Sequence, residues 1–120
     1  MKQPGPEHPI AITPHAGRVR VRVGGVTVAE TDAALVLTEG AYPPVFYIPR
    51  ADALWRCFVP SPRRSHCPYK GEAGYFGLSV DGIERPDAVW TYETPYPAVA
   101  AIRDHLAFYP DRVDAIEVVP

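Results

Sequence analysis

Residues 65–71, Ser-His-Cys-Pro-Tyr-Lys-Gly, gather the groups of this chain that could do chemistry. Cys67 follows His66 and lies close in sequence to two arginines and to Lys70, and positive charge near a thiol favours the reactive thiolate. The Lys70 amine could bind a carboxylate or phosphate, or react with a carbonyl if it is desolvated. Gly71 could let a ligand approach the backbone. We therefore take Cys67 and Lys70 as the candidate catalytic residues, and leave open whether the chain is an enzyme.

Each of these residues also has an ordinary structural interpretation. Free cysteines are among the most buried residue types, so Cys67 could simply pack beneath a Pro-rich loop. A lysine that follows a turn is usually solvated. Because neighbouring residues need not point toward one another, the sequence leaves both interpretations open.

Aromatic residues from elsewhere in the chain could form the walls of a pocket at this stretch. An apolar lining with a few polar tips is the usual composition of a small-molecule site, although the same residues would suit an ordinary core. Charged residues at strand ends, such as Arg50 and Glu39, could orient a substrate or form surface ion pairs. The predicted ligand-binding residues are Tyr47, Arg50, His66, Tyr69, Gly71, Tyr75, Trp90 and Tyr92.

Metal and cofactor sites are not expected. The four histidines and the two cysteines, Cys57 and Cys67, show no ligand spacing of a recognised kind. We therefore predict no metal ion and no cofactor.

The elements that must position these residues are mostly strands. Residues 18–23 alternate Arg and Val, Gly24 and Gly25 suit a tight turn, and residues 26–30 continue as the partner strand. Residues 61–74 are polar, non-periodic and contain proline, which predicts a loop. Residues 97–106 carry apolar side chains at helical spacing after Pro97 and predict one short helix. The other predicted strands are 34–37, 45–48, 75–80, 88–92 and 114–119.

This pattern predicts a mainly β fold, a β-rich α+β class with two packed antiparallel sheets or a half-open barrel. The 120 residues are enough for one domain. Residues 1–17 are rich in Pro, Gly and His and predict an extended N-terminal arm, so the single β-rich domain is expected over 18–120.

Composition limits the partners. A net charge of −2 gives no attraction to polyanions, so we expect no nucleic-acid partner. No segment has the roughly 18 consecutive apolar residues of a membrane span, and the N-terminus lacks the apolar run of a secretion signal. We expect a cytoplasmic protein with free thiols and no membrane partner.

Several segments match one known family. They include Tyr-Pro-Pro-Val-Phe-Tyr-Ile-Pro-Arg at 42–50, Ser-His-Cys-Pro-Tyr-Lys-Gly-Glu-Ala-Gly-Tyr-Phe at 65–76 and the run that begins at Ala88. In these motifs, above all Cys-Pro-Tyr-Lys-Gly, the chain resembles the family of domain of unknown function 427 (DUF427). The resemblance implies a compact β-rich domain, related to the tent-like pair of sheets in B-type methionine sulfoxide reductases and in the thalidomide-binding domain of cereblon. Those relatives often hold zinc between two Cys-x-x-Cys pairs, which this chain lacks.

Two hypotheses about function follow. The first is a small-molecule binding or catalytic domain whose pocket lies under the 61–74 loop. The alternative is a non-catalytic protein-interaction or homo-oligomerisation module, in which the loop and the arm dock a partner or a second copy to form a homodimer.

Overall fold

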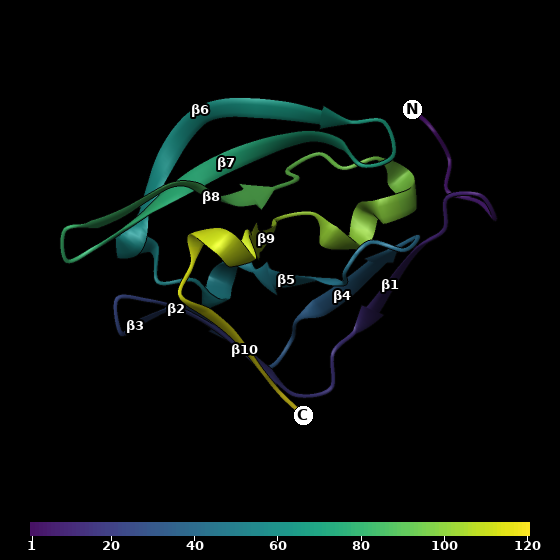
Figure 1. The fold of residues 1–120 in the computed structure, drawn as a ribbon. Helices are drawn as coiled ribbons and strands as arrows, with labels where there is room; N and C mark the ends of the chain where they lie inside the picture. Colours follow the sequence, from purple (N-terminus) through teal and green to yellow (C-terminus); the bar gives the residue numbers. More distant parts are fainter.

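The structure, a computed structural model, describes all residues from Met1 to Pro120. They form a seven-stranded antiparallel sheet in the order β1-β4-β5-β9-β8-β7-β6 and a three-stranded sheet in the order β10-β2-β3. In Figure 1, β6 and β7 arch over the top of the molecule, β1 and β4 lie at the lower right, and the smaller sheet closes the bottom. The predicted mainly β class with two antiparallel sheets is confirmed, and the sheets do not close into a barrel. The strands are β1 (Ile10–Pro14), β2 (Arg18–Val23), β3 (Val26–Thr31), β4 (Leu35–Glu39), β5 (Val45–Pro49), β6 (Phe58–Cys67), β7 (Gly71–Val80), β8 (Ile83–Thr91), β9 (His105–Phe108) and β10 (Ala115–Val119).

The smaller sheet is built on the predicted β2–β3 hairpin. Gly24 and Gly25 form its two-residue turn, with φ of 57° and 77°, a backbone conformation that residues with a Cβ adopt at a cost. Every second residue of β2 is a fully buried valine. The intervening arginines point outward and pair with acidic side chains, Arg18 with Asp32 and Arg20 with Glu30.

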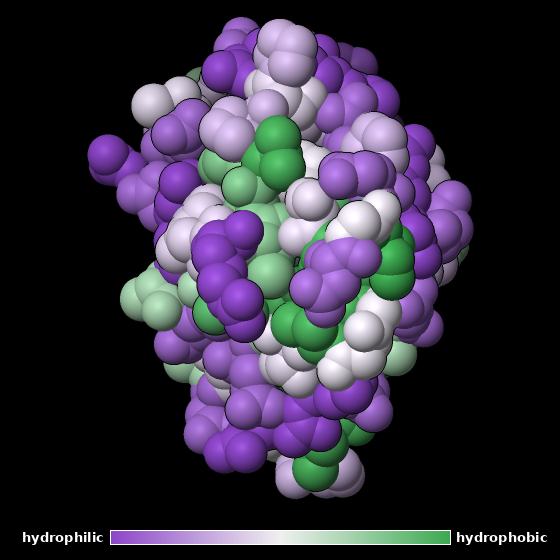
Figure 2. Space-filling view, turned by 90° about the vertical axis from the view of Figure 1, so that its left-hand side faces the viewer, coloured by the Kyte–Doolittle hydropathy of each residue, from purple (hydrophilic) through white to green (hydrophobic).

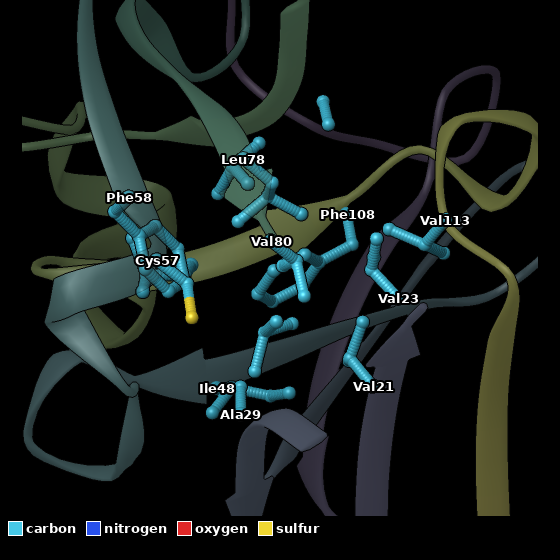
Figure 3. Packing of buried hydrophobic residues seen from close by; sticks show 14 of the residues in the cluster. Val21, Val23, Ala29, Ile48, Cys57, Phe58, Leu78, Val80, Phe108 and Val113 are labelled. Atoms are coloured by element: carbon cyan, nitrogen blue, oxygen red, sulfur yellow. The ribbon is translucent and has the colours of Figure 1, made fainter. Parts of the chain in front are cut away.

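The larger sheet is apolar on both faces. One face packs on the small sheet: in Figure 3, Val21 and Val23 of β2 lie opposite Val80 and Phe108 of the larger sheet. The other face carries a second cluster of eight buried residues. Because successive side chains of a strand point to opposite faces of the sheet, neighbouring residues of one strand belong to different clusters. The second cluster consists of Leu37, Tyr47, Ala73, Tyr75, Tyr92, Val99, Ile102 and Ala107.

The predicted loop at 61–74 is wrong. This segment is the end of β6, a turn at 68–70 and the start of β7, which together form an antiparallel hairpin. The prolines at 60 and 62 are tolerated because β6 is the edge strand, where one side of the backbone needs no hydrogen-bond partner. The register shifts between Ser61 and Arg64, which absorbs the irregularity. The Cys-Pro-Tyr-Lys-Gly motif therefore lies at a hairpin turn.

The predicted helix at 97–106 is also only partly present. Pro97–Ile102 is a 3₁₀ segment with a kink at Val99, and His105–Phe108 is strand β9. Asp104 has a positive φ of 56° and separates the two. Val99, Ile102 and Leu106 are buried as their spacing predicts. Leu106 is buried as part of a strand, because pairing of β9 with β5 and β8 prevails over helical continuation.

The N-terminal segment lies against the larger sheet. Its residues 10–14 form β1, which pairs with β4. The backbone N–H of Lys2 donates to the carbonyl of Pro68 at 2.7 Å, so the arm also reaches the β6–β7 turn.

The face that carries β3 and the β7–β8 turn shows an apolar patch framed by hydrophilic residues (Figure 2). None of the helical segments is long and apolar enough to cross a membrane.

Candidate functional site

A cavity of about 600 Å³ lies on the face of the larger sheet that carries the second cluster. Strands β4, β5, β7 and β8 and the β6–β7 turn each contribute to its walls. Its lining consists of Leu37, Glu39, Tyr42, Pro43, Pro44, Val45, Tyr47, Ser65, Lys70, Tyr75, Trp90, Tyr92, Tyr109 and Pro110.

Six of the 14 lining residues are aromatic, and the polar tips of three of them, Tyr47, Tyr75 and Trp90, are hydrogen-bonded. Trp90 donates its indole N–H to the hydroxyl of Tyr47 at 3.3 Å, and the ring of Trp90 lies 4.5 Å from that of Tyr109. The hydroxyls of Tyr75 and Ser65 are 2.6 Å apart. The wall is therefore apolar over its ring faces and polar at a few defined points.

Burial raises the pKa of Tyr47 and of Tyr92 well above the ordinary tyrosine value, so both phenols stay neutral even in alkaline solution. Burial, together with a hydrogen bond to Tyr75, also raises the pKa of Tyr109 to about 12. Neutral phenols can both donate and accept hydrogen bonds, so they can contact a carbonyl or hydroxyl of a ligand.

A chain of polar side chains forms one corner of the cavity. The Lys70 ammonium donates to Glu39 Oε1 at 2.5 Å and lies 3.7 Å from Cys67 Sγ. Glu39 Oε2 is 2.6 Å from Nε2 of His8 in the N-terminal arm. The His8 ring in turn stacks on Tyr69, with the ring centres 3.8 Å apart. The order of contacts is thus His8, Glu39, Lys70 and Cys67.

Glu39 is ionised at neutral pH. Burial alone would raise its pKa, but hydrogen bonds from Lys70 and His8 outweigh burial and leave the pKa below the usual glutamate value. Lys70 is only 8% exposed, so its ammonium depends on this carboxylate. An ammonium has three N–H donors, and two have protein partners here. The third has no protein partner.

The structure brings together the predicted Lys70 and four of the predicted aromatic residues. Tyr47, Tyr75, Trp90 and Tyr92 all line the cavity with Lys70. Cys67, the other predicted catalytic residue, is partly exposed and is not among the lining residues, but its sulfur lies 3.7 Å from the Lys70 ammonium, which is.

Four predicted ligand contacts, Arg50, His66, Tyr69 and Gly71, lie outside the cavity lining. The Arg50 guanidinium covers the rings of Trp55 and Phe76. His66 lies beside Tyr96, 3.4 Å from its hydroxyl. Tyr69 packs on His8 at the arm.

Gly71, the fourth of these predicted contacts, has a conformational role. Its φ is 105°, which closes the turn between β6 and β7.

Several residues of the cavity and its surroundings were not predicted. Glu39 was expected only as one of several charged residues at strand ends, and no ligand contact was predicted for Ser65 and Tyr109 of the lining or for His8, which contacts Glu39. A cross-strand pair such as Glu39 and Lys70, which are 31 positions apart, leaves no local pattern. The alternation of residues in β5 and β8 does predict that Tyr47 and Trp90 lie on the cavity face of the sheet. Their sequence neighbours Ile48 and Val89 pack on the opposite face, in the core between the two sheets.

Comparisons with known proteins identify a family. A family model described as domain of unknown function (DUF427) matches residues 11–119. No curated protein matches the chain significantly.

Proposed function

The chain belongs to the DUF427 family, and from that premise we propose that its cavity binds a small organic molecule. The observation that carries the proposal is the cavity itself. Its volume of about 600 Å³ falls in the range of roughly 300–1,000 Å³ that is usual for ligand pockets. Aromatic walls around a small number of fixed polar groups are the composition that such sites share.

The lining favours a ligand of a particular kind. The faces of Trp90 and Tyr109 suit a flat apolar group, because aromatic rings stack in offset or tilted arrangements. Lys70 and Glu39 are the charged residues of the lining, and they neutralise each other. We therefore propose an uncharged, largely flat molecule with a carbonyl or hydroxyl group at the end that meets Lys70.

Tryptophan fluorescence can test binding, since the two tryptophans have different environments. Trp90 lines the cavity, whereas Trp55 lies under Arg50 and beside Phe58. In a Trp55→Phe variant, Trp90 is the only tryptophan. We expect flat neutral fragments, such as substituted benzamides and phenols, to change its emission in a saturable manner.

A blocking variant provides the control. Ser65→Phe would place a ring in the cavity, and Thr38→Phe would place the same ring on the exposed surface of β4. Saturable binding should be lost in the first variant and kept in the second. If no fragment changes the emission, or if Ser65→Phe leaves binding intact, the cavity is not the binding site.

The alternative function, homo-oligomerisation or docking of a protein partner, predicts a different result. In that case small fragments have no effect on Trp90. The apparent mass of the protein in light scattering would then rise with concentration, or a protein partner would be required.

A further inference from the structure

We infer that Cys67, Lys70 and Glu39 form a nucleophilic centre for acyl transfer, with a small ester, thioester or amide as the substrate. The inference depends on the proposed function, because the cavity would hold the acyl group. It adds a reaction to that binding site and assigns a role to each of the three residues.

Cys67 supplies the nucleophile. It is partly exposed, whereas Cys57 is 5% exposed and packs in the core between the sheets. The sulfur lies 3.7 Å from the Lys70 ammonium, which lines the cavity, so the nucleophile is next to the wall of the proposed ligand site.

Lys70 supplies a hydrogen-bond donor for the developing oxyanion. Its ammonium lies 3.7 Å from Cys67 Sγ and lines the cavity, and its third N–H has no protein partner. A donor next to a nucleophile is placed to bind the oxygen on which negative charge develops during attack on a carbonyl. Because the side chain is 90% buried, this interaction would be weakly screened by water.

Glu39 is a positioning residue. Its carboxylate holds the ammonium at 2.5 Å, and its other oxygen contacts His8 at 2.6 Å. The contact with His8 limits rotation of the carboxylate, so Lys70 stays beside the sulfur. The N-terminal arm thereby becomes part of the centre.

The reaction is balanced with water as the only co-reactant. Cys67 Sγ forms a bond to the carbonyl carbon, and the bond from that carbon to the leaving group breaks. The thiol proton departs with the leaving group, so the products are an acyl thioester on Cys67 and the protonated leaving group. Water then hydrolyses the thioester to a carboxylic acid and restores the thiol.

The test uses 4-nitrophenyl acetate, a flat activated ester, and the wild-type protein. We expect a burst of about one equivalent of 4-nitrophenolate per chain, and peptide mass spectrometry should place one acetyl group on Cys67. The acylation rate should exceed that of N-acetylcysteine at the same pH by at least about 10-fold, since Lys70 stabilises the developing oxyanion. Cys67→Ala should abolish the burst, and Cys57→Ala should retain it.

Two further variants separate chemistry from folding and from binding. Lys70→Met should lower the acylation rate by about 100-fold, the usual effect of removing one oxyanion donor. Glu39→Gln should lower the acylation rate constant more than it changes the half-saturating ester concentration. Glu30→Gln, which breaks an exposed pair with Arg20 outside the cavity, should leave both unchanged. Circular dichroism of each variant checks that the fold is kept.

Several outcomes would overturn the inference. They are acetylation of Lys70 in place of Cys67, equal labelling of Cys57, and a rate no higher than that of N-acetylcysteine. If fragments bind at Trp90 while one of these results is obtained, the small-molecule site stands and the acyl-transfer centre is rejected. If neither binding nor acylation occurs, both proposals fail.

Discussion

Lys70 and Glu39 form a largely buried ion pair that joins the β6–β7 turn to the end of β4, although the two residues are 31 positions apart in the sequence. The pair also connects to the N-terminal arm, because His8 contacts the second oxygen of the same carboxylate. Three segments that no local pattern relates are thus held together at one corner of the cavity. The pair therefore has a structural role that can be measured separately from any chemistry.

Removing the charge of Glu39 should destabilise the fold. In Glu39→Gln the buried ammonium of Lys70 would lose its carboxylate, and we expect the free energy of unfolding to fall by about 3 kcal/mol. The matched control is Glu30→Gln, which breaks an exposed pair with Arg20 and should change the stability much less. Urea unfolding of both variants measures the difference. If both variants lose the same free energy of unfolding, the Lys70–Glu39 pair contributes no more to stability than an exposed pair.

The lowered pKa of Glu39 predicts a loss of stability in acid. The unfolded carboxyl titrates near its ordinary pKa of about 4.3, and the folded carboxyl titrates lower. The stability that Glu39 contributes is therefore complete above ~pH 5 and is lost as the pH falls through the lowered folded pKa.

Other carboxylates contribute to the acid dependence, so the measurement must isolate Glu39. Asp32 and Asp114 also have lowered pKa values, Asp32 through Arg18, and Asp114 through the backbone N–H of Gly24 and then Arg85. The relevant quantity is the difference in unfolding free energy between the wild type and Glu39→Gln. We expect that difference to be constant above ~pH 5 and to shrink steadily from there to ~pH 3. A difference that stays constant over this range would contradict the assignment.

Gly71 should be sensitive to substitution because of its backbone conformation. Its φ of 105° lies in the region that L-residues rarely adopt, and a Cβ there would meet no atom closer than 3.5 Å. The expected cost of Gly71→Ala, about 1–3 kcal/mol, therefore comes from backbone strain and does not come from a clash. Gly5→Ala, at a position with open space and no positive φ, is the control and should change stability little. Thermal or urea unfolding compares the two variants. If Gly71→Ala is as stable as Gly5→Ala, the positive φ of Gly71 does not require glycine.

Local patterns predicted the parts of the fold that depend on neighbouring residues. The β2–β3 hairpin follows from Arg-Val alternation and a Gly-Gly turn, and the two faces of β8 follow from the order of Val89 and Trp90. For the same reason the aromatic wall of the cavity could be predicted from the sequence.

The parts that could not be predicted depend on pairing between distant segments. The prolines of β6 indicate a loop unless the segment is known to be an edge strand. Leu106 fits a helix until β9 is seen to pair with β5 and β8. The contact of Glu39 with Lys70 and His8 arises only when β4, the hairpin turn and the arm come together. Lys70 and four aromatic residues of the cavity lining could accordingly be predicted from the sequence, whereas the contact of Glu39 with Lys70 could not.

The indole N–H resonances offer the most direct measurement of the central claim that the cavity binds a small molecule. The protein has two tryptophans, so a ¹H–¹⁵N spectrum contains two indole signals, and the Trp55→Phe variant assigns them. On titration with a flat neutral fragment, the Trp90 signal should shift and saturate, because its N–H donates to Tyr47 at the cavity wall. The Trp55 signal, whose N–H donates to the carbonyl of Arg50 outside the cavity, should stay in place. A fragment library that leaves Trp90 unmoved, or that moves Trp55 instead, would contradict the account.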